Sequence, residues 1–267
     1  MLRANSALLT AVLLCAANAA HAQEPHDQAT KTRMVHVFVA LADNQHQGII
    51  PVPAKIGNGE DAANNLYWGS AYGVKTFFSH SPDWERPACT LSPKPAILER
   101  CIFRYKSAPM YLIADAYRGT EIKQAVWDFF EAAGGGTDSA TVSVQPTVMN
   151  LPAHGEADLV AYIGHDGLMD FQLPKYPQRK DGTRRDAIVL ACASKQFFRD
   201  GVQASGAYPL LWTTGLMAPE AYTLKSALDG WIAGEGHEQI RERAAGAYDK
   251  YQKCGAKAAH HLFASGW

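Results

Sequence analysis

Two short hydrophobic segments decide the fold of this chain: DLVAYIGHDG at residues 158–167 and DAIVLACAS at residues 186–194. Each contains an apolar run with the length and β-branched content of a strand buried on both faces of a parallel sheet. The first run leads into His165 and the second into Cys192. Because ligands bind beyond the carboxyl ends of strands in open α/β sheets, this pattern predicts a site at that edge.

The relative direction of these two strands determines whether the imidazole and the thiol meet. The connection between them, residues 168–184, is long enough for a parallel crossover, but it has no clear helical pattern. Parallel neighbours would place both side chains at one edge of the sheet. Antiparallel strands would place them at opposite ends.

Three more apolar runs are predicted as strands, at residues 34–41, 110–114 and 208–212, with a short edge strand at 141–144. Helical patterns alternate with the strands, at residues 61–77, 120–130, 193–198, 219–231 and 236–264. Strands that alternate with helices predict an α/β fold. We expect three layers, with a mainly parallel sheet of five or six strands and helices on both faces.

The N-terminus has the pattern of a signal peptide. Arg3 precedes an apolar stretch at residues 7–20, and Ala20-His21-Ala22 forms a small-x-small cleavage signal. We therefore expect residues 1–22 to be removed, residues 23–32 to be disordered, and residues 33–267 to form one exported domain, periplasmic or secreted. No later stretch reaches the ~18 apolar residues of a membrane span, so we expect no membrane association after cleavage.

Composition narrows the function further. The chain has 25 basic and 26 acidic residues and no basic block, which argues against nucleic acid and anionic membranes as partners. Neither Cys-x-x-Cys nor His-Glu-x-x-His occurs, so we expect no zinc site and no other metal or cofactor.

Four cysteines follow the predicted cleavage point, and an even count in an oxidising compartment suggests disulfides. Cys89 and Cys101 flank a Pro-rich loop, and we predict that they pair with each other. Cys192 and Cys254 then remain. Either they form a second disulfide, which would remove the nucleophile, or both are free.

A histidine beside a cysteine is the minimum apparatus for thiolate catalysis. In this interpretation Cys192 is the nucleophile and His165 the general base. A helix that begins after Cys192, together with nearby Lys195, would favour the thiolate. Backbone N–H groups of Asp166 and Gly167, with that of Cys192, are candidates for an oxyanion hole. Asp166 would orient the imidazole or simply cap a turn, and an inert core cysteine beside a turn histidine is the structural alternative.

The segments YIGHDG (162–167) and IVLAC (188–192) resemble the caspase–gingipain–legumain superfamily of cysteine peptidases. The signature of that superfamily is a hydrophobic strand ending in His-Gly, followed by another ending in Ala-Cys. The resemblance spans residues 34–232 and implies a caspase-like fold, His165 and Cys192 as catalytic residues, a peptide or protein substrate, and no cofactor. The chain departs from the pattern where Asp166 separates His from Gly and where Leu190 precedes Ala-Cys.

The resemblance also implies substrate contacts near the sheet edge. Thr213 and Thr214 follow the next strand, and Asp115 and Asp170 are possible acidic contacts that would favour a basic substrate side chain. The segments LYWG (66–69) and TTGLMAP (213–219) are similar to those of secreted bacterial proteins of unknown function, which implies no activity.

These observations predict an exported, caspase-like cysteine peptidase or amide hydrolase that uses Cys192 and His165. The alternative is a non-catalytic secreted α/β domain that binds a peptide or glycan at the same edge of the sheet.

Overall fold

The computed structural model describes residues 32–85, 87–136, 142–144, 147–149 and 151–267. From residue 32 onward they belong to one compact unit. The predicted signal peptide, and all but the last residue of the predicted disordered terminus, lie outside these ranges.

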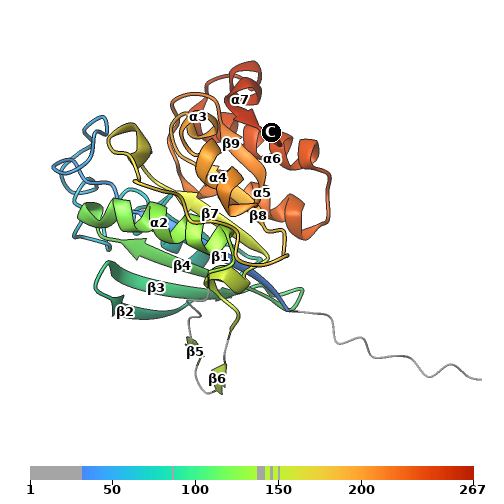
Figure 1. Cartoon of the computed structure of the whole chain (residues 1–267). Coiled ribbons are helices and arrows are strands. Elements are labelled where there is room, and N and C mark those ends of the chain that lie inside the picture. Colours follow the sequence, from blue (N-terminus) through green and yellow to red (C-terminus); the bar gives the residue numbers. More distant parts are fainter. Residues whose placement is uncertain (1–31, 86, 137–141, 145–146, 150) are drawn as a thin grey trace, which may run out of the picture. The chain divides into compact units, whose positions relative to one another are not determined.

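One mixed, mostly parallel sheet of eight strands forms the centre of this α/β fold (Figure 1). The strand order is β10-β9-β8-β7-β1-β4-β3-β2. The five central strands run parallel: β4 (Met110–Tyr117), β1 (Arg33–Ala40), β7 (Leu159–Ile163), β8 (Asp186–Leu190) and β9 (Tyr208–Thr213). Three further strands join antiparallel: β3 (Ile97–Arg104) beside β4, and the edge strands β2 (Ala88–Lys94) and β10 (Phe263–Ala264). The expected parallel centre is confirmed, and the antiparallel edges enlarge the sheet beyond five or six strands.

Both faces of the sheet are covered, which explains the continuous apolar runs. Along β1, Val35, Val37 and Val39 enter one core, and Met34 and Phe38 enter the other. The first core includes side chains of α1 (Val74–Ser79), α5 (Ala221–Ile232), α6 (His237–Gln252) and α7 (Ala256–Leu262). The second includes those of α2 (Ile122–Ala133) and α4 (Arg199–Ser205). The three layers follow from this alternation of side chains along each strand.

The neighbouring strands β7 and β8 are parallel, with Leu159 beside Asp186 and Ile163 beside Leu190. Their connection contains only a 3-10 turn, η3 (Gly167–Met169), as regular structure. The predicted parallel arrangement is therefore confirmed without the usual crossover helix, and the antiparallel alternative is excluded.

The predicted helix at residues 61–77 is wrong, because regular helix begins only at Val74. Asn65 ties this region into turns, since its amide accepts from the N–H of Ala42 and donates to the carbonyls of Ala42 and Asn58. Such side-chain bonds to the backbone compete with helix formation.

The Pro-rich segment between Cys89 and Cys101 is not a loop but the hairpin of β2 and β3. Cys89 and Cys101 are direct cross-strand partners and form the predicted disulfide. Pro93 is tolerated because β2 is an edge strand, where an N–H is not needed for the next strand.

The long C-terminal helix predicted at 236–264 is interrupted. Lys253 and Gly255 have positive φ values, and they separate α6 from α7. The last two residues of the predicted helix, Phe263 and Ala264, form β10 instead. The predicted edge strand at 141–144 is also revised. Val142–Val144 forms β5, which pairs with β6 (Thr147–Met149) in a separate two-stranded sheet, and Thr141 lies outside the described residues.

Among the described residues, no helix has the length and apolar character needed to cross a bilayer.

The disulfide gives a stability prediction. Replacing both Cys89 and Cys101 by Ser should lower the free energy of unfolding by about 3 kcal/mol, because the crosslink closes a short loop of the unfolded chain. Thermal or urea unfolding of the two proteins measures this difference. Reductant should destabilise the wild type and leave the double variant unchanged; equal sensitivity of both would contradict the assignment.

Candidate active site

A pocket of about 280 Å³ lies at the carboxyl ends of the central strands. In the sheet, β1 lies between β4 and β7, so the chain first continues on one side of β1 and later returns to its other side. Such a point, where the strand order reverses, is where open α/β sheets bind ligands. The walls come from the segments after β1 (48–52), β7 (164–169) and β9 (216–219), with Cys192 after β8 and the pair Leu66 and Tyr67.

Cys192 lies in a tight turn between β8 and the four-residue helix α3 (Ser194–Phe197). Ala193 holds this turn with a left-handed backbone conformation, φ 47° and ψ 32°. Thr213 supports it from the neighbouring strand: its hydroxyl donates to the carbonyl of Ala191 and accepts from the N–H of Ser194. These contacts fix the direction in which the Cys192 side chain leaves the sheet.

His165 is held at its own strand end by two contacts. Its Nε2 lies 2.7 Å from Oδ2 of Asp170, and that oxygen also accepts from the N–H of Gly48 at 2.9 Å. The hydroxyl of Tyr162 donates to the carbonyl of His165. Since Asp170 occupies Nε2, Nδ1 is the ring nitrogen left to exchange a proton with a ligand or thiol.

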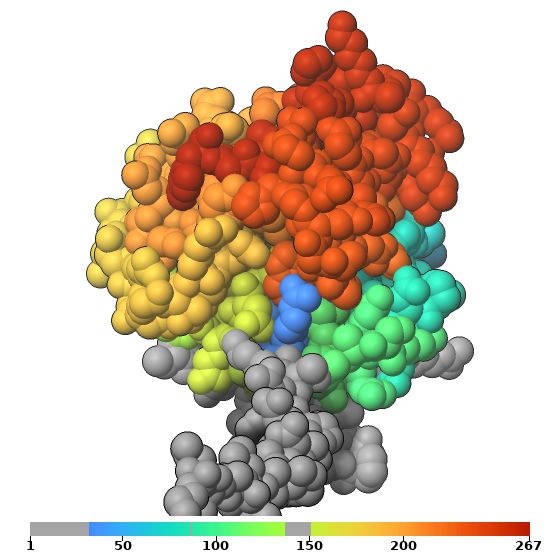
Figure 2. Space-filling view, turned by 90° about the vertical axis from the view of Figure 1, so that its right-hand side faces the viewer, coloured from blue at the N-terminus to red at the C-terminus, as the bar shows by residue number. Residues whose placement is uncertain are grey.

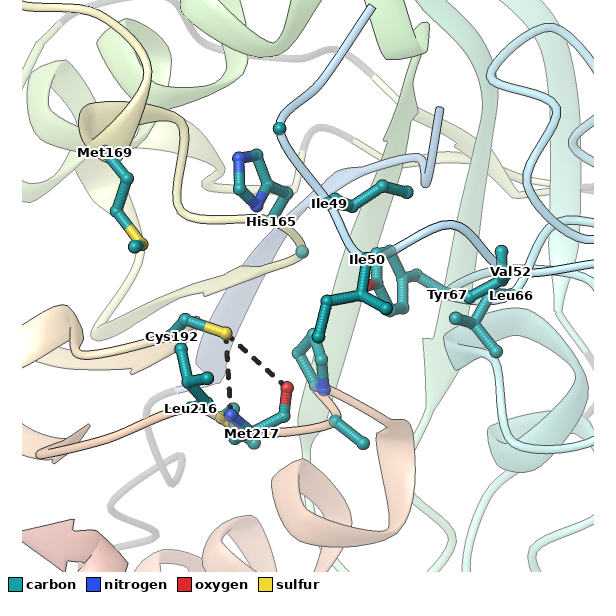
Figure 3. A pocket seen from close by; sticks show the side chains of 14 residues that line it. Ile49, Ile50, Val52, Leu66, Tyr67, His165, Met169, Cys192, Leu216 and Met217 are labelled. Atoms are coloured by element: carbon teal, nitrogen blue, oxygen red, sulfur yellow. Dashed lines mark hydrogen bonds between the residues drawn. The ribbon is translucent and has the colours of Figure 1, made fainter. Parts of the chain in front are cut away.

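Cys192 and His165 border the same pocket, as Figure 3 shows. They do not hydrogen-bond each other in the part of the chain that the structure describes. The sulfur instead contacts Met217, whose N–H donates to it at 3.5 Å and whose carbonyl lies 3.6 Å away. The two side chains therefore share the pocket without a direct hydrogen bond. Catalytic hydrogen bonds are often longer in the free enzyme than in the substrate complex.

The surroundings of Cys192 do not favour the thiolate in the way that the sequence suggested. Burial raises the pKa of the Cys192 thiol; the hydrogen bond with the Met217 backbone partly opposes this rise, and the Asp166 carboxylate adds a smaller increase. Lys195 points its ammonium toward the ring of Trp212. The helix after Cys192 has only four residues, too short for a substantial dipole.

Asp166 caps the η3 turn and does not orient the imidazole, a role that falls to Asp170. Its Oδ1 accepts from the N–H of Leu168. The side chain is fully buried, and Oδ2 has no hydrogen-bond partner among the described residues. Burial, assisted by the charge of Asp170, raises the pKa of Asp166 from 3.8 to about 7.

Two of the oxyanion candidates, Asp166 and Gly167, lie on the turn that carries His165 and are not among the pocket-lining residues, whereas Cys192 lines the pocket. A side chain at Gly167 would collide with the ring of Phe171, so no ligand backbone approaches there. Gly164 does line the pocket. Its φ is +145°, and a Cβ would lie 2.6 Å from the carbonyl oxygen of Ala40, so this position requires glycine.

The four predicted substrate contacts separate in the structure. Asp115 is fully buried within β4, where its carboxylate binds Arg100 and His36. Thr213 is buried beneath the Cys192 turn. Thr214 donates to the carbonyl of His261. Of the four, only Asp170 contacts a candidate catalytic residue, through its hydrogen bond with Nε2 of His165.

Cys192 and Cys254 are both free thiols, so the nucleophile candidate is not consumed by a disulfide. Cys254 is exposed in the break between α6 and α7.

Two groups of possible metal ligands occur among the described residues, and both have other roles. Cys89 and Cys101, beside Glu99, already form the disulfide. Asp128 and Glu131 lie near His154, which precedes β7 and so occupies the opposite end of the strand from His165. Asp128 accepts from Tyr117 and Gln124, and Glu131 pairs with Lys180.

Sequence reasoning missed several pocket residues. Ile49 and Ile50 follow β1, and Leu216 and Met217 follow β9. The sequence could have indicated these residues, because segments that follow parallel strands lie at one edge of the sheet.

Comparison with known proteins finds no matching family model, no significantly similar curated protein and no significantly similar solved structure. The functional argument therefore rests on the geometry of the site.

The buried carboxylate of Asp166 gives a prediction about pH. Its pKa is about 7 when folded and near 3.8 when unfolded, so folding disfavours its ionised form. Wild-type stability should therefore fall between about pH 4 and pH 7, by up to ~4 kcal/mol from this group. Asp166→Asn should unfold at a higher temperature than wild type at pH 8.5, with little difference at pH 4.

Thermal denaturation across this pH range measures the effect. Asp200→Asn, at an exposed position, is the matched control and should show no such gain at pH 8.5. If the melting temperatures of Asp166→Asn and wild type changed in parallel at every pH, ionisation of the Asp166 carboxylate would not destabilise the fold.

Proposed function

We propose that this protein is an exported, caspase-like cysteine hydrolase that cleaves an amide bond, with Cys192 as nucleophile and His165 as general base. The observation that carries the proposal is the placement of both side chains on one pocket, at the ends of adjacent parallel strands. This is the arrangement that the resemblance to the caspase–gingipain–legumain superfamily implies.

The proposed reaction proceeds through an acyl-enzyme. His165 takes the thiol proton through Nδ1 while Sγ of Cys192 forms a bond to the carbonyl carbon. The C–N bond then breaks, and the proton passes from the imidazole to the departing amine. Water hydrolyses the thioester, with His165 as base, and regenerates the thiol. Asp170 stabilises the imidazolium that forms in each half-reaction.

The raised pKa of the thiol is compatible with this chemistry when proton transfer accompanies attack. A neutral thiol beside a neutral imidazole becomes nucleophilic as the base removes its proton, so the ion pair need not exist beforehand. The backbone N–H of Cys192 donates to no other group among the described residues, and we assign it to the developing oxyanion.

The same observations support one alternative function. A thiol with a raised pKa and no hydrogen bond to the imidazole is also what a non-catalytic binding domain would contain. In that case the pocket would hold a peptide or glycan without cleaving it.

Export is part of the proposal. The Cys89–Cys101 disulfide supports it, because such bonds persist mainly in oxidising compartments.

The proposal predicts a thiol whose reactivity depends on His165. In a Cys254→Ser background, iodoacetamide should label Cys192 near neutral pH, and His165→Ala should slow labelling by about 10-fold or more. Asp170→Asn should slow it less, because the imidazole remains but loses its orienting partner. Mass spectrometry of the labelled peptide measures the rates.

A fluorogenic peptide panel tests catalysis, with Cys192→Ala as the control. Cleavage that disappears in Cys192→Ala supports the enzyme. Labelling unaffected by His165→Ala, with no cleavage of any peptide, would leave the binding domain as the function.

A further inference from the structure

The pocket beside Cys192 is built for an uncharged ligand. Its walls carry the apolar side chains of Ile49, Ile50, Val52, Leu66, Met169 and Leu216. The ionisable groups that line it are the thiol of Cys192, the imidazole of His165 and the phenol of Tyr67. Among the described residues that line it, none carries a carboxylate, an ammonium or a guanidinium.

Neither of the two carboxylates expected to bind a basic substrate lines the pocket. Asp170 uses Oδ2 for both His165 and the N–H of Gly48. Asp115 lies inside the sheet between Arg100 and His36. A cationic side chain in the pocket would lose hydration with no carboxylate in the pocket wall to pair with, which is unfavourable.

The rim of the pocket also exposes apolar side chains to water. Ile50 is 81% exposed and Leu216 67%, and they extend from opposite sides of the Cys192 sulfur in Figure 3. Met169 is 45% exposed on a third side. Large apolar side chains gathered around an opening mark a surface that a ligand covers.

On the basis of the proposed function, we propose that this pocket receives an apolar side chain on the acyl side of the cleaved amide, of the size of Leu, Met or Phe. The sulfur forms part of the wall, so a side chain in the pocket lies next to the attacked carbonyl carbon. The volume of about 280 Å³ is near the lower limit, ~300 Å³, of pockets that hold small molecules. It suits one side chain and its adjoining amide.

Matched fluorogenic peptides test the inference, identical except for Leu, Phe, Asn, Asp or Arg before the cleaved bond. The Leu and Phe peptides should have kcat/KM values on the order of 100-fold or more above those of the Asp and Arg peptides. Every rate should vanish in Cys192→Ala.

A charge introduced at the rim gives a sharper test. Ile50→Glu places a carboxylate at the mouth, and Ile50→Gln is its neutral match; the high exposure of Ile50 makes both variants tolerable to the fold. Both should lower kcat/KM for the Leu peptide. Only Ile50→Glu should raise the ratio of Arg to Leu cleavage, by about 10-fold, and high salt should reduce that gain.

The outcomes separate the two proposals. Cys192-dependent cleavage that prefers Arg, Asp or Asn in the wild type overturns the apolar specificity and leaves the hydrolase intact. Equal Arg-to-Leu ratios in Ile50→Glu and Ile50→Gln also contradict the placement of the side chain at this rim. If no peptide is cleaved in a Cys192-dependent way, the hydrolase and this inference fall together.

Discussion

The parallel pairing of β7 with β8 is the constraint on which the site depends. Side chains alternate between faces along a strand, and parallel neighbours end at the same edge. The pairing of Ile163 with Leu190 therefore brings His165 and Cys192 to one opening. A crossover helix normally enforces this direction, but here the connection has only the η3 turn. The pairing is instead fixed by burial, since both strands are apolar on both faces.

The sequence was most informative where hydrophobic burial alone determines structure. The runs at 34–41, 159–163 and 186–190 became β1, β7 and β8 because continuous apolar segments have few alternatives to a covered parallel sheet. It was least informative where side chains bind the backbone. Asn65 replaced an expected helix with turns, and a Pro-rich segment became an edge hairpin because the sheet needed no further donor there.

The site, too, was predictable where burial sets the structure and not where side-chain hydrogen bonds set it. The two reactive residues follow from strand ends, whereas the role of Asp170 depends on the fold of a short turn that brings it back to His165. Thr213 was placed near the right strand, yet it supports the Cys192 turn from beneath. No role in the site was predicted for residues 66–69 or 216–219, but residues of both line the pocket, since loops distant in sequence converge at this edge.

The contact between the N–H of Gly48 and the carboxylate that holds His165 has a mechanical consequence. Gly48 begins the same stretch whose next residues, Ile49 and Ile50, form a pocket wall. A displacement of this wall would be transmitted to Asp170, and through it to the imidazole ring. In the proposed hydrolase, the pocket wall and the general base would thus be connected by two hydrogen bonds that share one carboxylate oxygen.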